Sequence, residues 1–256
     1  MYRFKTGILI GFNTLVMIVF LTMPLFAVSQ YRNSALNGGE QIWWEAEDFD
    51  KIAADGTMKL KADSIVQPPL SGAFGDDYIV HQGIADVPAN MDTAFVEYQL
   101  GFVSKGGTWF MWMRESHDRR AGADGRLQNS CWIQVNSVPD NPAGFDNAKH
   151  RIGQTTGFPS VPDLWVWAGY SETGAGAEQG RLNGLLITLK GDGKDVIRVY
   201  SREGRSEPST WAHDVLMIST VDFVPKDDNY LTAESGVPVQ PAGKLPMIWG
   251  RIKDAR

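Results

Sequence analysis

Short runs of apolar residues recur along the chain after residue 30, and many of them alternate apolar with polar positions. The runs are rich in β-branched and aromatic residues, and clusters of Gly, Pro, Asn and Asp separate them, as in strands joined by turns. Helical periodicity is almost absent. Many short strands at this spacing favour an all-β jelly-roll β-sandwich. The strands are predicted near 41–47, 58–61, 77–81, 94–101, 107–114, 131–136, 165–168, 184–190, 195–201 and 213–220.

The clearest turn lies in LLITLKGDGKDVIRVYSRE, residues 185–203, where two apolar runs flank a Gly-Asp-Gly sequence. Such a turn between two alternating runs predicts a β-hairpin. Three long polar loops are predicted at 115–130, 137–164 and 171–183. Long loops on a rigid sandwich are where such folds place their binding residues.

The two ends of the chain differ from its middle. Arg3 and Lys5 precede an uncharged apolar stretch, which ends in the small residues of positions 27–29. This order predicts that residues 1–29 are a signal peptide or an uncleaved N-terminal membrane anchor, with the remainder exported. A sandwich domain is predicted over 40–225, and a tail rich in Pro, Gly and charge, predicted to be extended, over 226–256.

Charge and cysteine content narrow the function classes. The chain has 24 basic and 30 acidic residues, a net charge of -6 and no basic stripe, which argues against a nucleic-acid or anionic-membrane surface. Cys131 is the only cysteine, so neither an intrachain disulfide nor a cysteine-based zinc site is expected. A monomer is expected, in contact with a membrane only through an uncleaved N-terminal segment.

Acidic residues follow two tryptophans in IWWEAEDFD, residues 42–50. On a strand, Glu45 and Glu47 point to the same side, and two carboxylates that close repel each other unless a cation or a proton intervenes. Three interpretations are open. The pair is a solvated face, a site for a hard cation such as Ca²⁺, or the acid/base pair of a glycosidase with its carboxyls about 5–9.5 Å apart.

Four motifs stand in a recognisable order: WEAEDFD, DDYIVHQG, GTWFMWMRE and VYSREGRSEPSTWAHDVLMISTVDFVP. This series resembles carbohydrate-binding modules of families 6, 35 and 36, which have a galactose-binding-like β-sandwich, over residues 41 to 225. Carried over by position, the resemblance implies that Glu45, Glu47 and Asp214 bind a structural Ca²⁺. His213 points the opposite way from Asp214 on a strand and is not counted as a ligand.

The resemblance also implies where a sugar binds. Sugars offer an apolar C–H face to an aromatic ring and a rim of hydroxyls to polar groups. In family 6 a tyrosine and a loop tryptophan clamp the sugar, and the matching residues here are Tyr78 and either Trp165 or Trp167. The spacing of the two tryptophans leaves open which of them faces solvent.

The chain departs from that family just before the last strand, where an Asn usually completes the cleft. Here the sequence is SEPSTW, which offers Ser209, Thr210 and Trp211 in its place. Arg202 is a further candidate at the sugar rim with Glu203, and a framework ion pair is the alternative role for these two residues.

No nucleophile elbow, zinc-protease motif or phosphate loop is present. The sequence therefore predicts an exported, non-catalytic carbohydrate-binding protein that holds a polysaccharide or glycoconjugate and a structural Ca²⁺. The alternatives are a small glycoside hydrolase or polysaccharide lyase on the same sandwich, and a surface adhesion or structural module that binds no sugar.

Overall fold

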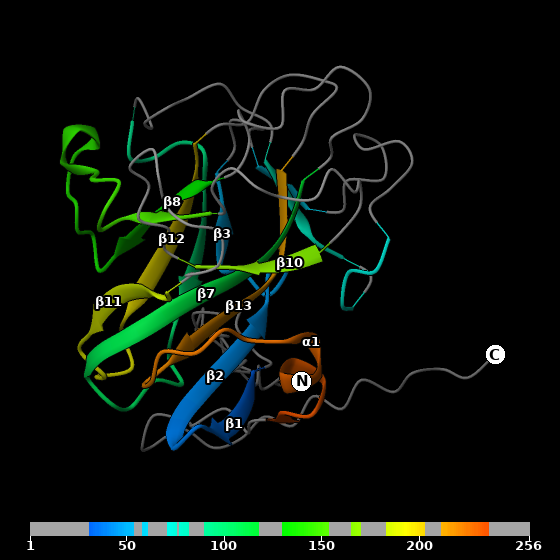
Figure 1. Cartoon of the computed structure of the whole chain (residues 1–256). Helices are drawn as coiled ribbons and strands as arrows, with labels where there is room; N and C mark the ends of the chain where they lie inside the picture. The colour runs from blue at the N-terminus through cyan, green and yellow to red at the C-terminus, as the bar shows by residue number, and fades with distance from the viewer. Residues whose placement is uncertain are drawn as a thin grey trace, which may run out of the picture.

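Two antiparallel β-sheets pack face to face in the computed structural model (Figure 1). Within the described ranges no helix combines the length and the apolar character needed to span a bilayer. The predicted signal or anchor segment, 1–29, lies outside these ranges. The described residues are 31–53, 58–60, 71–75, 77–81, 90–117, 130–153, 165–169, 183–202 and 211–235.

The larger sheet has nine strands and follows the order β10-β7-β13-β2-β1-β14, with β11 paired to β7 and the β4–β5 pair joined to β13. Its strands are β1 (Arg32–Leu36), β2 (Gly39–Glu45), β4 (Met58–Leu60), β5 (Ile79–His81), β7 (Gly107–His117), β10 (Trp165–Ala168), β11 (Leu185–Leu189), β13 (Trp211–Ser219) and β14 (Glu234–Ser235).

The smaller sheet has five strands in the order β3-β6-β12-β8-β9. A 3₁₀ turn, η2 (Pro142–Gly144), follows β8, and a short helix, α1 (Asp227–Leu231), follows β13. The strands of this sheet are β3 (Lys51–Ile52), β6 (Phe95–Gln99), β8 (Cys131–Val135), β9 (Arg151–Ile152) and β12 (Val196–Ser201).

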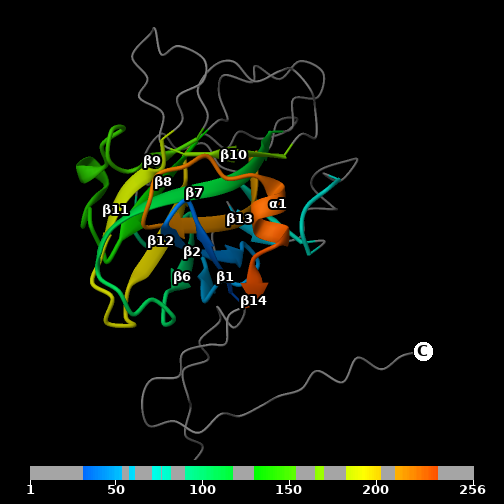
Figure 2. The ribbon, with the colours of Figure 1, turned by 60° about the horizontal axis from the view of Figure 1, so that its bottom comes forward.

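The predicted all-β sandwich is confirmed, and each of the ten predicted ranges overlaps a strand. The larger sheet extends beyond the predicted domain limits of 40 and 225. Strand β1 precedes β2 as a hairpin, and β14 pairs with β1 after the chain has passed through α1. Figure 2 shows α1 and β14 beside β1, so the first residues after 225 belong to the sandwich.

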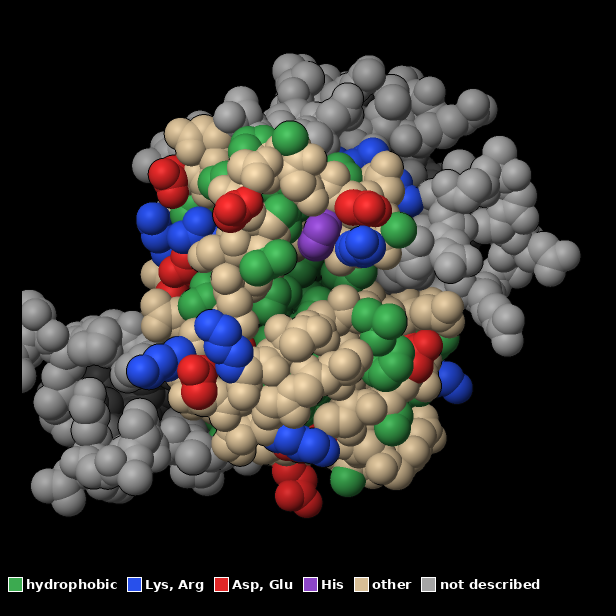
Figure 3. Space-filling view, turned by 90° about the vertical axis from the view of Figure 1, so that its left-hand side faces the viewer, with side chains coloured by type: hydrophobic (Ala, Val, Ile, Leu, Met, Phe, Trp, Pro, Cys, Tyr) green, Lys and Arg blue, Asp and Glu red, His purple; other side chains and the backbone are tan. Residues whose placement is uncertain are grey.

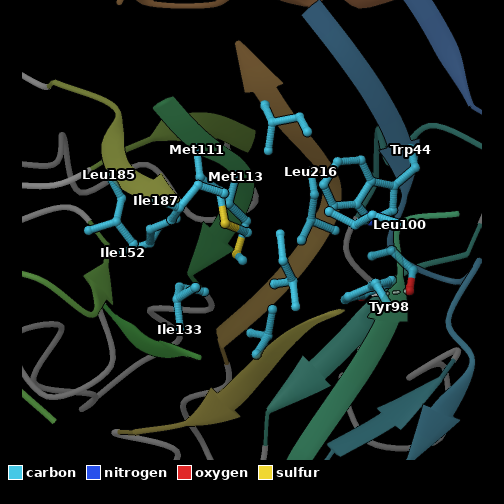
Figure 4. Close-up of a cluster of buried hydrophobic side chains, with 14 of the residues drawn as sticks. Trp44, Tyr98, Leu100, Met111, Met113, Ile133, Ile152, Leu185, Ile187 and Leu216 are labelled. Atoms are coloured by element: carbon cyan, nitrogen blue, oxygen red, sulfur yellow. Dashed lines mark hydrogen bonds between the residues drawn. The ribbon is translucent and has the colours of Figure 1, made fainter. Parts of the chain in front are cut away.

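The main core lies between the two sheets and follows the alternation of the strands. Trp44, Met111, Met113 and Leu216 of the larger sheet face Tyr98 and Ile133 of the smaller one (Figure 4). A second apolar cluster lies on the outer face of the larger sheet, where Tyr230 of α1 contributes to its cover. Adjacent positions on β2 therefore serve two cores, with Trp44 inside the sandwich and Trp43 beneath α1.

The predicted hairpin of β11 and β12 is wrong. Strand β11 pairs with β7 in the larger sheet, whereas β12 pairs with β6 and β8 in the smaller one, so the intervening turn carries the chain between sheets. Asp195 fixes this turn by accepting hydrogen bonds from the backbone N–H groups of Lys190 and Gly191, at 2.8 and 2.7 Å. Gly191 has φ +69°, and a Cβ there would lie 2.0 Å from the nitrogen of Gly106. The Gly-Asp-Gly sequence thus specifies a reversal of the chain but not the partners of its strands.

Candidate functional site

A β-bulge in β13 determines which way its acidic residue points. The register of β13 with β7 shifts between His213 and Val215, which leaves Asp214 as the additional residue. His213 contacts Tyr98 of the smaller sheet, whereas Asp214 contacts Arg114 and the backbone of Phe74. Asp214 and His213 therefore point to opposite faces, as the sequence predicted.

The structure brings Glu45, Glu47 and Asp214 together on the outer face of the larger sheet. Strands β2 and β13 are neighbours, and Glu45 lies opposite Val215 in their register. A Cβ on Gly75 would lie 2.8 Å from one carboxylate oxygen of Glu45 and 2.8 Å from one of Glu47. Gly75 also has φ +72°, so a larger residue there is disfavoured both sterically and by its backbone conformation. We call these three carboxylates the acid cluster.

The acid cluster holds more negative charge than its surroundings favour. Burial raises the pKa of Glu47 to about 9, and the charges of Glu45 and Asp214 add to the effect. Burial also raises the pKa of Asp214 to about 7, against the opposing effects of the Phe74 N–H and the Arg114 guanidinium. Among the described residues, Oε2 of Glu47 and Oδ1 of Asp214 are buried and have no hydrogen-bond partner. The cluster therefore suits an additional proton or cation.

Arg114 is the cation that the cluster already contains. Its Nη1 lies 2.5 Å from Asp214 Oδ2, and its Nε and Nη2 each donate to a carboxylate oxygen of Asp227 at 3.0 Å. The guanidinium carbon lies 3.9 Å from the centre of the Phe74 ring. Tyr230 donates a hydrogen bond to Glu45. Two residues of α1 thus make direct contact here: Tyr230 with Glu45 of the acid cluster, and Asp227 with Arg114.

Two buried histidines lie on the core side of the same bulge. His81 Nε2 and His213 Nδ1 are 2.7 Å apart, and His213 Nε2 lies 3.1 Å from the Tyr98 hydroxyl. Tyr98 donates its single proton to the carbonyl of Ala46 at 2.9 Å. Because that proton is used, His213 must donate through Nε2, and His81 must donate to His213 Nδ1. The direction of each of the three hydrogen bonds that link His81, His213, Tyr98 and Ala46 is therefore fixed.

Acidification is expected to destabilise the protein through these histidines. Burial lowers the pKa of His213 to about 3, and burial and then His213 lower the pKa of His81 well below its usual value. Both are neutral when folded but take up protons near pH 6.5 when unfolded, so stability falls as the pH drops below 6.5. Between pH 7.5 and 5 the contribution of each histidine to the free energy of unfolding should fall by about 2 kcal/mol.

Urea unfolding of wild type and His81→Gln at the two pH values tests this expectation. Glutamine can donate to His213 without titrating. Acidification also favours the protonated forms of Glu47 and Asp214, which opposes the loss in both proteins equally. The change in the free energy of unfolding between the two pH values should therefore differ between variant and wild type by about 2 kcal/mol, with the variant losing less. An unchanged pH dependence in the variant would contradict the assignment.

The rings predicted to clamp a sugar are packed in this structure. Tyr78 and Trp165 contact each other edge to face, with ring centres 5.7 Å apart, and are 2% and 8% exposed. A sugar sandwiched between two rings requires about 7–8 Å between them, twice a carbon–carbon contact distance. Trp167 is 7% exposed, contacts Trp43 and donates from Nε1 to Asp227 at 3.0 Å. Sugar binding by these rings stays a prediction.

The other two predicted sugar contacts lie elsewhere. Arg202 follows β12 in the smaller sheet, where its guanidinium carbon lies 5.1 Å from the centre of the Trp132 ring and Nη1 donates to Ser130 at 2.5 Å. Trp211 pairs through its backbone with His81 of β5, and its side chain lies outside the described atoms, as does Glu203. The structure thus brings Tyr78 and Trp165 together but places Arg202 on the other sheet.

A polar groove on the outer face of the smaller sheet was not predicted. Arg198 of β12 lies directly opposite Glu97 of β6 and Gln134 of β8, which makes a polar row across three strands. A cavity of about 260 Å³ lies over this row, with Lys190 and Lys194 also lining it. The alternation in VEYQ, IRVY and WIQV places one polar residue on the same face of each strand, and this pattern could have revealed the row.

The fit of the acid cluster to a metal ion depends on its donor atoms. Within the described ranges no three His, Cys, Asp or Glu side chains are already arranged as the ligands of one metal ion. The donor set nevertheless consists of oxygen atoms, which Ca²⁺ prefers, and two of these atoms are buried without a partner. The residues therefore fit a hard cation in chemistry, and calcium binding stays a prediction.

Comparison with known proteins adds little to this description. No family model matches the chain, and no curated protein matches it. The K1 cleaved adhesin domain of Lys-gingipain from Porphyromonas gingivalis W83 is a solved structure similar to it, with a TM-score of 0.30 and 10% sequence identity. The similarity covers 73% of this chain and 96% of the adhesin domain. A TM-score this low assigns neither a family nor a function.

Proposed function

We propose that the protein is an exported, non-catalytic carbohydrate-binding β-sandwich that holds a polysaccharide or glycoconjugate and one structural Ca²⁺. The observation that supports this function is the convergence of Glu45 and Glu47, at and just after the end of β2, with Asp214 of the neighbouring strand β13. The resemblance to carbohydrate-binding modules implied this set, and a β-bulge directs Asp214 to the required face.

Calcium would be held by the acid cluster. Its charge would stabilise the carboxylates in their ionised form, because their burial and mutual repulsion otherwise favour protonation. Arg114 supplies one positive charge to Asp214 and Asp227, and the Glu45–Glu47 pair lacks an equivalent partner among the described ion pairs. An ion at this position would connect β2 to β13 and stabilise only the folded state.

The same geometry supports binding over glycoside hydrolysis. Glycosidase carboxyls flank the bond that is cleaved and must both reach the substrate. Here Glu45 accepts a hydrogen bond from Tyr230, and both carboxylates lie so close to Gly75 that a Cβ there would be 2.8 Å from an oxygen of each. Both carboxylates are thus engaged by neighbouring parts of the chain, which supports a structural role for the pair.

A glycan array probed with the full chain tests the proposal. The protein should retain one class of glycan in Ca²⁺, release no reducing ends or unsaturated sugars from it, and bind more weakly in EDTA. Turnover of a retained glycan would favour the hydrolase or lyase. Absence of binding to every glycan, in Ca²⁺ and with the protein folded, would contradict the proposal and favour an adhesion module.

A further inference from the structure

The polar groove of the smaller sheet has walls that are fixed in place. Arg198 donates to Glu97 at 2.6 Å, and its guanidinium carbon lies 4.4 Å from the centre of the Phe95 ring. Gln134 donates to the carbonyl of Pro139 at 2.5 Å, and its Oε1 lies 3.1 Å from the Tyr200 hydroxyl, which donates to the carbonyl of Met91 at 2.9 Å. Binding a ligand here would require little ordering of these side chains, which reduces the entropic cost of association.

Two lysines at the groove differ from these fixed residues. Lys190 and Lys194 are exposed at the ends of the turn that Asp195 stabilises, and within the described ranges neither ammonium forms an ion pair. The nearby carboxylates are already engaged. Glu97 pairs with Arg198, Asp195 accepts three N–H groups, and Asp192 accepts the backbone N–H of Lys194.

The charge of the rest of the surface does not by itself attract an anion to Lys190 and Lys194. Figure 3 shows basic and acidic side chains interspersed over one side of the molecule, without a large patch of one sign. The net charge of the chain is -6. Any attraction of an anion to the groove must therefore come from the local arrangement of Lys190, Lys194 and Arg198, and not from a general positive field.

We infer that the groove binds an anionic sugar unit of an acidic polysaccharide, with Lys190 and Lys194 on its carboxylate or sulfate group. This inference rests on the proposed function and names the ligand class and its place. Gln134 retains one N–H and Glu97 one oxygen for sugar hydroxyls, while Val196 provides an apolar contact. The cavity of about 260 Å³ is slightly smaller than the roughly 300–1,000 Å³ typical of sites for drug-sized ligands, so it suits a single sugar unit.

Binding of the full chain to matched pairs of polymers tests the inference. Polygalacturonate is compared with its methyl ester, and dextran sulfate with dextran, so that each pair differs only in charge. The acidic member of at least one pair should bind, and its binding should weaken as salt is added. The pair that shows the difference identifies the anionic group as a carboxylate or a sulfate.

The variant Lys190→Gln/Lys194→Gln should weaken that binding at least about tenfold, because each lysine loses a charge-assisted hydrogen bond. Lys149→Gln/Lys226→Gln removes two exposed lysines outside the groove and should bind as the wild type does. Equal binding by both double variants would overturn the inference. Binding of neutral glycans only would also overturn it, while the proposed function would stand. If the protein also binds no glycan on the wider array, both this inference and the proposed carbohydrate-binding function are contradicted.

Discussion

Replacement of Arg114 by methionine is expected to destabilise the protein by about 3–5 kcal/mol, the usual cost of leaving buried charges without their partner. Arg114 is 5% exposed, and it binds Asp214, which is fully buried, together with Asp227. Without the guanidinium, Asp214 must remain charged among other carboxylates or take up a proton. Urea unfolding near neutral pH, followed by tryptophan fluorescence, would measure the change in the free energy of unfolding.

Arg198→Met provides the matched control. Arg198 also forms an ion pair, with Glu97, but its side chain is 23% exposed and lines the groove. Loss of a pair that solvent reaches costs about 1 kcal/mol or less. An Arg114→Met variant no less stable than Arg198→Met would show that the acid cluster does not depend on its arginine.

Calcium is expected to stabilise the protein, and removal of one carboxylate should abolish the effect. A ligand at one hundred times its Kd stabilises the folded state by about 2.7 kcal/mol, which corresponds to an increase in Tm of roughly 5–10 °C for a domain of this size. Glu47→Gln should remove this increase. Glu40→Gln, which replaces an exposed glutamate near the start of β2, should retain it.

The pH dependence in EDTA gives a second measure of the same cluster. The folded pKa of Glu47 is raised to about 9, so its contribution to stability is present below the unfolded value near 4.5 and is lost as the pH rises towards 9. The metal-free protein should therefore be less stable at pH 8.5 than at pH 7, and Glu47→Gln should reduce that difference. A Tm that responds neither to Ca²⁺ nor to this substitution would contradict the calcium site.

The sequence was sufficient to predict ten of the strands and the face that residues take along them, whereas β1, β3, β9 and β14 were not predicted. A period of two predicts that Glu45 and Glu47 take one side and Trp44 the other, and the two glutamates do lie together although β2 ends at Glu45. The pairing of strands was less predictable, because it depends on contacts between distant segments. The Gly-Asp-Gly turn looks the same in sequence whether β11 and β12 join one sheet or two.

The surroundings of the acid cluster were harder to predict for the same reason. Arg114 and Asp214 are 100 residues apart, and no local pattern links them to Asp227 of α1. The composition of the segment after residue 225 predicts an extended tail, yet Tyr230 packs on Trp43 and Phe74. Apolar and aromatic residues scattered through a polar segment have no periodicity, so burial of a single ring in it is not visible from sequence.

The position of β13 has a consequence for how the protein is made. This strand lies in the middle of the larger sheet and pairs with β2, β5 and β7, although it comes after all of them in the chain. A polypeptide that emerges N-terminus first leaves these three strands without their common neighbour until residue 219 has appeared. The larger sheet can therefore close only after β13 has emerged, and a product truncated before this strand would expose the edges of β2 and β7 to other chains.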